Sequence, residues 1–221
     1  MYSLIVPTMW RYKPFIPFLK DLVEFHLIDE IIIIDNNPNQ RPIDVVSVSQ
    51  KITFYSFGSN IFVNPAWNHG VALAKNNKIC ILNDDLIFDL RTFYRVNELL
   101  DDPTTGMIGI APGDHPTLTG QPRVTDGKID IIPHTNEHLW GIGMFFFINK
   151  KNWQPIPDEL KMFYGDNWIF DGHKKVGRVN YLITNSLMFT PYSVTSRNFA
   201  KDFDIPDRDL YAKLSAERIY V

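Results

Sequence analysis

Short apolar runs that end in polar or proline-containing turns recur along the chain, and segments with helical spacing separate them. Residues 2–6 and 30–34 form the first two runs. Such runs are typical of strands that are buried on both faces. Between them, apolar side chains recur every three or four residues from Phe15 to Phe25, which predicts an amphipathic helix. The pattern therefore predicts a β-α-β unit with parallel strands.

The alternation continues in the first half of the chain and changes character in the second. Pro65 suits the first helical position after an Asn64 cap, and Asp89 suits the cap of the next helix. Residues 112–133 carry Gly, Pro and alternating residues, which indicates a hairpin region. We expect an α/β fold with a mostly parallel central sheet. The expected later strands are 45–48, 52–55, 78–82, 107–110, 140–148 and 178–182. The expected later helices are a short one that starts at Pro65, and 90–100, 166–175 and 207–217.

Composition agrees with a globular domain. The 221 residues are 45% hydrophobic and 14% aromatic, which is enough for one α/β domain with a substantial core. The formal charge of −3 gives no global attraction to nucleic acid, so such binding would need a local basic patch. The candidates for that patch are Lys150, Lys151, Lys174, Lys175 and Arg178.

Cysteine content and hydropathy indicate the compartment. The single cysteine, Cys80, lies within an apolar run and can form no internal disulfide. No apolar run approaches the roughly 20 residues that span a bilayer, and residues 1–6 are too short for a signal peptide. We therefore expect no integral membrane segment and a cytoplasmic protein.

Adjacent carboxylates directly follow a predicted buried strand. Asn83, Asp84 and Asp85 come after residues 78–82 and cannot continue the core. In an open α/β sheet the carboxyl ends of the strands face the ligand crevice. Carboxylate oxygens there suit Mn²⁺ or Mg²⁺ that carries phosphates. The alternative is an acidic turn that caps the next helix.

Several motifs occur together in a fixed order. They are Ile-Val-Pro-Thr at 5–8, Ile-Asp-Asn-Asn at 34–37, Ala-Trp-Asn-His-Gly at 66–70, Leu-Asn-Asp-Asp at 82–85, Trp-Gly at 140–141 and Tyr-Gly-Asp at 164–166. In this order the chain resembles the GT-A nucleotide-sugar transferases over about residues 2–182, most closely the small inverting enzymes of glycosyltransferase family 2, including compact members of viral or phage type. The resemblance implies a Rossmann-like GT-A domain over 1–221. Residues 1–111 would bind the nucleotide sugar, and 112–221 would bind the acceptor. If the chain is viral, its compartment would be the host cytoplasm.

The resemblance also assigns the donor side. Pro7 and Thr8 would line the nucleotide pocket, and Asp35 with Asn36 would meet the base and ribose. Many relatives carry two aspartates at the latter site, and Asn36 offers a donor as well as an acceptor. The alternative for residues 35–38 is a plain turn after a buried strand.

The phosphate side departs from the family pattern in two places. Asn68 matches the asparagine of an Arg-Asn-x-Gly pattern, but Trp67 stands where arginine is common, and Arg11 is the candidate to compensate. In the Asp-x-Asp element the first position is Asn83. Asp84 would then lie near the ribose, and Asp85 would bind Mn²⁺ or Mg²⁺, which stabilises the leaving diphosphate.

Asp166 is the candidate general base, by its match to the catalytic carboxylate of the family. It would take the proton of the acceptor hydroxyl during a single inverting displacement. The alternative is a helix cap, and Asp171 is a second candidate base. Trp140 and Gly141 are the candidate acceptor-binding residues. His134, His138 and His173 lack the spacing of a zinc site.

The resemblance implies a hexosyl- or pentosyltransferase that uses a nucleotide-diphosphate sugar, with a UDP-sugar favoured. The acceptor would be a glycan or another hydroxyl compound, and a hydroxymethylated DNA base is an alternative. That alternative requires the basic residues to gather beside Asp166. Alternatives of another class are a nucleotidyltransferase and a non-catalytic carbohydrate-binding protein. A nucleotidyltransferase is disfavoured because no Gly-rich segment with a following basic residue lies near the first strand.

Overall fold

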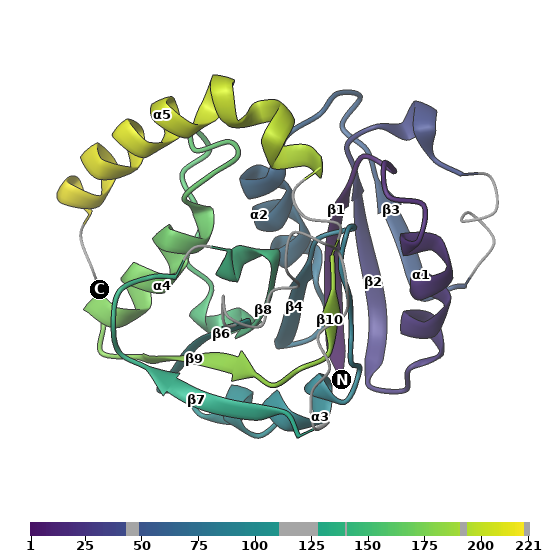
Figure 1. Ribbon diagram of the computed structural model, residues 1–221, viewed down its shortest axis with the longest axis horizontal. Coiled ribbons are helices and arrows are strands. Elements are labelled where there is room, and N and C mark those ends of the chain that lie inside the picture. The colour runs from purple at the N-terminus through teal and green to yellow at the C-terminus, as the bar shows by residue number, and fades with distance from the viewer. Residues whose placement is uncertain (43–48, 111–127, 140, 191–193, 219–221) are drawn as a thin grey trace.

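One large mixed sheet organises the chain. The computed structural model describes residues 1–42, 49–110, 128–139, 141–190 and 194–218 (Figure 1). Within them, eight strands form a sheet in the order β3-β2-β1-β4-β8-β6-β9-β7, and β10 and β5 form a separate two-stranded sheet. The strands are β1 (Tyr2–Thr8), β2 (Ile28–Asp35), β3 (Ile52–Tyr55), β4 (Lys78–Leu82), β5 (Ile87–Phe88), β6 (Thr105–Ile110), β7 (Asp130–His134), β8 (Phe145–Asn149), β9 (Val179–Thr184) and β10 (Met188–Phe189).

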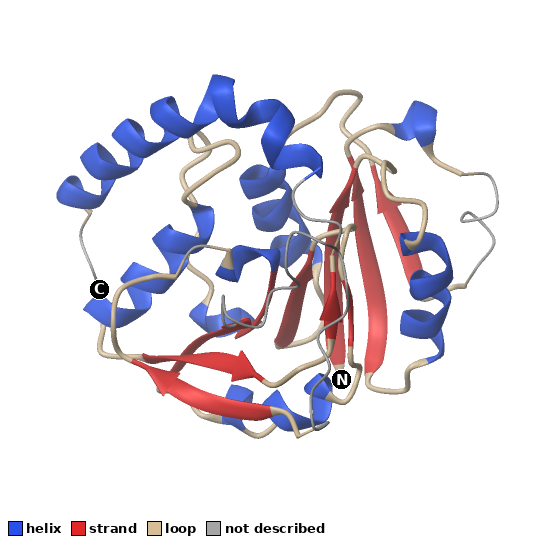
Figure 2. Cartoon of the chain, in the orientation of Figure 1, coloured by secondary structure: helices blue, strands red, loops and turns tan. Residues whose placement is uncertain are grey.

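Helices cover both faces of the sheet (Figure 2). Side chains of α1 and α3 pack in one hydrophobic core, and side chains of α2 and α4 pack in the other, with α5 against it. Alternate residues of one strand feed the two cores, since Leu4 and Val6 enter the first and Ile5 enters the second. The helices are α1 (Phe15–Glu24), α2 (Val63–Leu73), α3 (Thr92–Val96), α4 (Gly165–Lys175) and α5 (Val194–Glu217), with short 3-10 turns η1 (Pro38–Gln40), η3 (Leu99–Asp101), η5 (Ile142–Met144) and η6 (Lys150–Asn152).

The first four strands of the order are parallel, as the sequence predicts. β1 lies between β2 and β4, and β2 pairs with β3. β8 then enters antiparallel between β4 and β6, while β6 and β9 are parallel. The carboxyl ends of β1, β2 and β4 therefore open at one edge of the sheet, and the amino end of β8 lies beside the end of β4.

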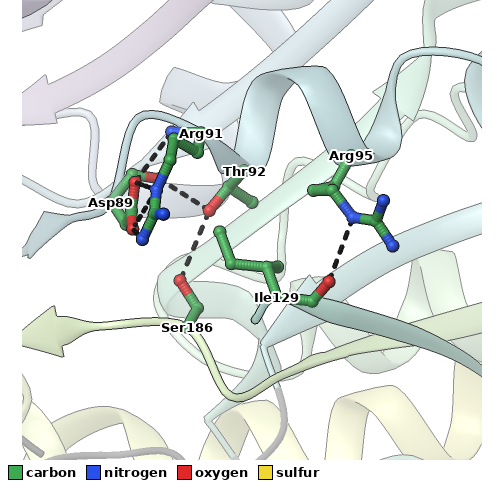
Figure 3. A network of polar contacts seen from close by, with 6 residues as sticks. All are labelled: Asp89, Arg91, Thr92, Arg95, Ile129 and Ser186. Carbon is green, nitrogen blue, oxygen red and sulfur yellow. Dashed lines mark hydrogen bonds and ion pairs between the residues drawn. The ribbon is translucent and has the colours of Figure 1, made fainter. Parts of the chain in front are cut away.

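The predicted helix over residues 90–100 is wrong in extent. The predicted Asp89 cap is also wrong, because the α-helix begins at Thr92 after Arg91, which is the N-cap and makes no side-chain cap. Asp89 bonds in the turn before the helix: its Oδ1 accepts the Arg91 backbone N–H at 2.9 Å, and Thr92 Oγ1 donates to the Asp89 carbonyl at 2.7 Å (Figure 3). The α-helix stops at Val96 and a 3-10 turn follows. Lys78 Nζ donates to the Asn97 carbonyl at 2.8 Å, so that carbonyl bonds to a side chain of β4.

Figure 3 also shows how this segment is fastened to the second half of the chain. Thr92 Oγ1 and Ser186 Oγ lie 3.3 Å apart, and both residues are buried. Arg95 Nε donates to the Ile129 carbonyl at 3.0 Å. The two polar contacts hold α3 against residues that lie far away in the sequence.

The predicted Asn64 cap of α2 is also wrong. The helix begins at Val63 after Phe62, which has a φ of 67° and makes no side-chain cap. Asn64 is buried within the first turn, and its Nδ2 donates to the Phe163 carbonyl at 2.9 Å. Pro65 still lies in the first turn, where its missing N–H costs no helical hydrogen bond.

The second half differs from its prediction in two places. Of the hairpin region expected over 112–133, the structure describes β7, which pairs antiparallel with β9; residues 111–127 lie outside the described ranges, as does the expected strand 45–48. The strand expected over 140–148 begins only at Phe145, after η5. The last helix starts at Val194 and carries Pro206 inside it, so its first half was missed. In the described residues, no helix is both long and apolar enough to cross a membrane.

Candidate functional site

A pocket of 430 Å³ opens at the carboxyl edge of the sheet. Its walls come from the ends of β1, β2 and β4, the start of α2, the segment around η5, the start of α4 and the first half of α5. Phe62 and Tyr164, which line it, have φ values of 67° and 62°, and such backbone strain is typical of functional sites. The predicted site residues that line it are Pro7, Thr8, Asn36, Asp84, Asp85, Gly141 and Asp166.

The paired aspartates lie on one side of this pocket. Thr8 Oγ1, at the end of β1, donates to Asp84 Oδ2 at 2.5 Å. Burial raises the pKa of Asp84, while hydrogen bonds from Thr8 and from backbone N–H groups oppose that rise. Burial and the negative charge of Asp84 raise the pKa of Asp85 to about 6. The two carboxylates therefore repel each other, and a cation would relieve the repulsion.

Asp166 lies in the first turn of α4, as the sequence predicts, and it lines the same pocket as Asp84 and Asp85. Its Oδ2 accepts hydrogen bonds from His138 Nε2 and from the Gly143 backbone N–H, both at 3.0 Å. Burial works to raise the pKa of Asp166, but the charge and hydrogen bond of His138, together with backbone N–H groups, hold it below its usual value. A carboxylate kept ionised in a pocket can accept a proton from a bound hydroxyl.

Asp35 is next to the pocket but does not line it. Its Oδ1 accepts from Trp10 Nε1 at 2.9 Å and from the Asn37 N–H at 3.1 Å, and its Oδ2 pairs with Arg41 Nε at 2.5 Å. Both carboxylate oxygens are thus engaged inside the protein. Asn36 does line the pocket, and its Oδ1 accepts the Ile61 N–H at 3.0 Å.

The structure places three other predicted residues elsewhere. Asn68 does not line the pocket; its side chain donates to the Ile156 carbonyl at 2.7 Å and accepts from Trp153 Nε1 at 3.2 Å. Arg11 is exposed and is also absent from the lining. Trp140 lies outside the described residues.

Trp67, which stands in the place of the family arginine, is buried and lines the pocket. Its ring packs edge-to-face on Phe146 at 5.4 Å. Its indole Nε1 is buried and has no hydrogen-bond partner among the residues that the structure describes. The substitution therefore removes a cation and supplies a flat apolar wall.

The described part of the pocket wall is strongly acidic. It contains Asp84, Asp85, Asp166 and Asp204, one histidine, and no Lys or Arg. No group of three or more His, Cys, Asp or Glu side chains could hold a metal ion within the described ranges. The donor set therefore fits an ion that takes a single firm carboxylate ligand and completes its shell with water and phosphate oxygens.

The basic residues considered for nucleic-acid binding do not line this pocket. Lys150 Nζ donates to the Ala72 and Ala74 carbonyls, and Lys174 Nζ donates to the Asn136 carbonyl. Lys174 lies in the last turn of α4, and Asp166 lies in its first turn. The basic residues therefore do not gather beside Asp166.

The sequence reasoning missed the α5 wall of the pocket. Asp204 of α5 lines it, together with the segment 162–164. Asp207 is 3% exposed, and its Oδ2 accepts the backbone N–H groups of Met162 at 2.9 Å and Phe163 at 2.8 Å. No motif marks these contacts, since they join segments more than 40 residues apart. His138 was also missed as the partner of Asp166.

Comparisons with known proteins agree with this geometry. The family model described as "Glycosyl transferase family 2" matches residues 3–173. No curated protein matches the chain. Residues 1–349 of S. aureus TarS, solved in complex with UDP, match with a TM-score of 0.63 and 12% identity over 90% of this chain and 62% of that one. A structure of S. aureus TarS matches with a TM-score of 0.61 and 13% identity over 90% of this chain and 38% of that one. The chain thus spans less than two thirds of these structures, and the likeness shows the GT-A-like fold.

Proposed function

The chain belongs to glycosyl transferase family 2, and we propose on that basis that it transfers a sugar, with inversion, from a nucleotide-diphosphate sugar to a hydroxyl acceptor. One observation carries the proposal. Asp84 and Asp85 lie in the same 430 Å³ pocket as Asp166, so a diphosphate site and a base share one cavity. An inverting transfer needs these two functions on opposite sides of the anomeric carbon.

The donor site consists of the ends of β1, β2 and β4. Thr8 and Asn36 present polar groups to the pocket at the first two of these ends. We propose a UDP-sugar as donor, and the complex of S. aureus TarS with UDP supports this choice. Asp35 would contact the base after exchanging at least one of its internal partners, Trp10 or Arg41.

Mn²⁺ or Mg²⁺ is proposed at Asp85. The pocket wall has four aspartates and no Lys or Arg in the described residues, so it offers a diphosphate no cationic side chain. A divalent ion would stabilise the charge that develops on the leaving diphosphate. Asp85 would hold the ion directly, and Asp84, held by Thr8, would orient the donor.

Asp166 is proposed as the general base. It takes the proton of the acceptor hydroxyl while that oxygen attacks the anomeric carbon, and the bond from that carbon to the diphosphate oxygen breaks. With Asp166 as base, the acceptor would lie between the start of α4 and Asp204, which line the same pocket. Because this wall is acidic, we propose a neutral hydroxyl compound such as a glycan, since a polyanion such as DNA would meet uncompensated repulsion.

The test is a thermal-shift panel of UDP- and GDP-sugars, with and without Mn²⁺, followed by product analysis. A donor at 100 times its Kd stabilises by about 2.7 kcal/mol, which corresponds to a rise in Tm of about 5–11 °C for a chain of this size. Asp85→Asn should lose the part of the rise in Tm that depends on Mn²⁺. Asp166→Asn should keep donor binding and lose transfer and donor hydrolysis.

Asp158→Asn is the matched control, because Asp158 is exposed and lies outside the pocket lining. A binding protein without catalysis would bind sugars equally well in all variants and hydrolyse no donor. A nucleotidyltransferase would instead form a nucleotide sugar from a nucleoside triphosphate and a sugar phosphate. Either result would contradict the proposal.

A further inference from the structure

His138 and Asp166 form a partly buried pair in the wall of the pocket. The His138 side chain is 8% exposed and the Asp166 side chain 17%, and Nε2 lies 3.0 Å from Oδ2. The imidazole packs edge-to-face on Phe170, with ring centroids 5.4 Å apart and an interplanar angle of 87°. Phe170 is itself fully buried, so its ring restricts the movement of the imidazole.

Two donors converge on one oxygen of the carboxylate. His138 Nε2 and the Gly143 N–H both bind Oδ2 at 3.0 Å, and they approach from the segment 138–143 that precedes β8. Gly143 cannot carry a side chain here, since an added Cβ would lie 2.7 Å from Oδ2. The backbone N–H groups of Asp166 and Asn167 also favour the ionised form of this carboxylate.

We propose that His138 is a positioning residue for the reaction: it fixes the rotamer of Asp166 and keeps this carboxylate ionised in a pocket that holds three further aspartates. This inference rests on the proposed function of Asp166 as the base. The physical reason is that burial favours protonation of Asp166, whereas the charge of His138 and its hydrogen bond to the ionised form oppose it.

The titration of the His138–Asp166 pair also depends on the titratable and charged groups around it. Asp84 and Asp85 after β4, Tyr164 before α4 and Asp204 of α5 share the pocket with the pair. His134 of β7 also contacts the Phe170 ring, at 5.8 Å. Lys174 of α4 bonds to the Asn136 carbonyl, in the segment that leads to His138. None of these groups donates a hydrogen bond to Asp166 within the residues that the structure describes, so the effect of His138 on it can be isolated.

His138→Phe and His138→Gln test the proposal together. Phe keeps a ring against Phe170 but removes the donor, whereas Gln offers an amide N–H near the place of Nε2. We expect His138→Phe to lower kcat about 10- to 100-fold with little change in donor KM, because a misplaced base slows the chemical step. The acid limb of its pH profile should move to higher pH, and His138→Gln should recover part of both effects.

His134→Gln is the matched control, because His134 contacts the same phenyl ring but its imidazole bonds to the Glu137 carbonyl and not to Asp166. It should leave kcat and the acid limb unchanged. A carboxyl ¹³C titration of Asp166, assigned with Asp166→Asn, gives a readout that needs no turnover. The pKa of Asp166 should rise in His138→Phe and stay unchanged in His134→Gln.

The outcomes separate the two proposals. If the wild-type enzyme transfers sugar while His138→Phe matches His134→Gln in kcat, acid limb and the pKa of Asp166, the role of His138 is refuted and the glycosyl transfer stands. If His138→Phe raises the pKa of Asp166 but Asp166→Asn leaves transfer intact, Asp166 is not the base, and the positioning role falls with it.

Discussion

Removal of the Asp207 carboxylate should detach α5 from the pocket. Asp207 is 3% exposed and accepts two backbone hydrogen bonds, at 2.9 Å from Met162 and 2.8 Å from Phe163. Asp207→Ala leaves both N–H groups without their acceptor. Hydrogen bonds to charged groups contribute about 1.5–3 kcal/mol each, and two on one oxygen are not additive, so we expect a loss of about 3 kcal/mol.

Asp207→Asn should cost less, about 1 kcal/mol, because a single carbonyl oxygen can still accept both N–H groups. Urea unfolding followed by tryptophan fluorescence measures both values, and the Tm of Asp207→Ala should fall by about 6–12 °C. Asp209→Ala is the control on the same helix, since Asp209 pairs only with its exposed neighbour Arg208 and should change stability by less than about 0.5 kcal/mol.

The same variant tests the link between α5 and the pocket. Met162 and Phe163 line the pocket, so their release in Asp207→Ala should raise the acceptor KM more than the donor KM. A loss of stability below about 1 kcal/mol would refute the reasoning about the buried carboxylate. An unchanged acceptor KM despite a full loss of stability would refute the assignment of α5 to the acceptor side.

Four further predictions concern the pocket itself. Asp85→Asn should stabilise the metal-free protein by about 2 kcal/mol at pH 7.5, because the pKa of Asp85 is raised to about 6 in the folded state, so its cost to folding grows as pH rises from the ordinary pKa to about 6 and is complete above that value; an unchanged unfolding free energy would count against this. In the wild type, Mn²⁺ affinity should fall as pH drops below about 6, which calorimetry can measure. Thr8→Val should raise the pKa of Asp84 further and weaken donor binding about tenfold, since Asp84 loses the hydrogen bond at 2.5 Å. Calorimetry measures the donor affinity, and an affinity equal to that of the wild type would show that Asp84 does not orient the donor. Gly143→Ala should lower kcat by about 100-fold with a normal circular dichroism spectrum, because its Cβ would displace Asp166; wild-type kcat would refute the close approach.

The sequence predicted the strands that carry the donor side with good accuracy. The limits of β4 are those predicted, and β1 and β2 contain the predicted runs. These strands are buried on both faces, and this burial requires the continuous hydrophobic runs that the local sequence shows. The helix over 90–100 was wrong because a lysine of β4 competes for its backbone, and no local pattern reports such a contact.

For a similar reason, the sequence predicted the place of some candidate residues in the pocket but not of others. Asp84 and Asp85 follow a predicted strand, so the rule that strands open at one sheet edge predicts their place in the pocket, whereas Asp166 was predicted from its match to the family's catalytic carboxylate. Asn68 matches a family motif, yet its amide bonds to Ile156 and Trp153 and holds the loop after β8. A motif match does not by itself say whether a side chain meets the ligand or the scaffold.

The sequence by itself determined the parallel β-α framework and the identity of the acidic groups at its edge, because hydrophobic period and turn chemistry are local properties of the chain. Only the tertiary structure decided which partners those groups have. His138 bonds to Asp166 although 28 residues separate them in the sequence, and Asp207 accepts backbone N–H groups of the residues 44 and 45 positions before it. These pairings arise from the packing of α4 and α5 beside the sheet. Burial of charge makes such partners necessary, but it does not say where in the sequence they stand.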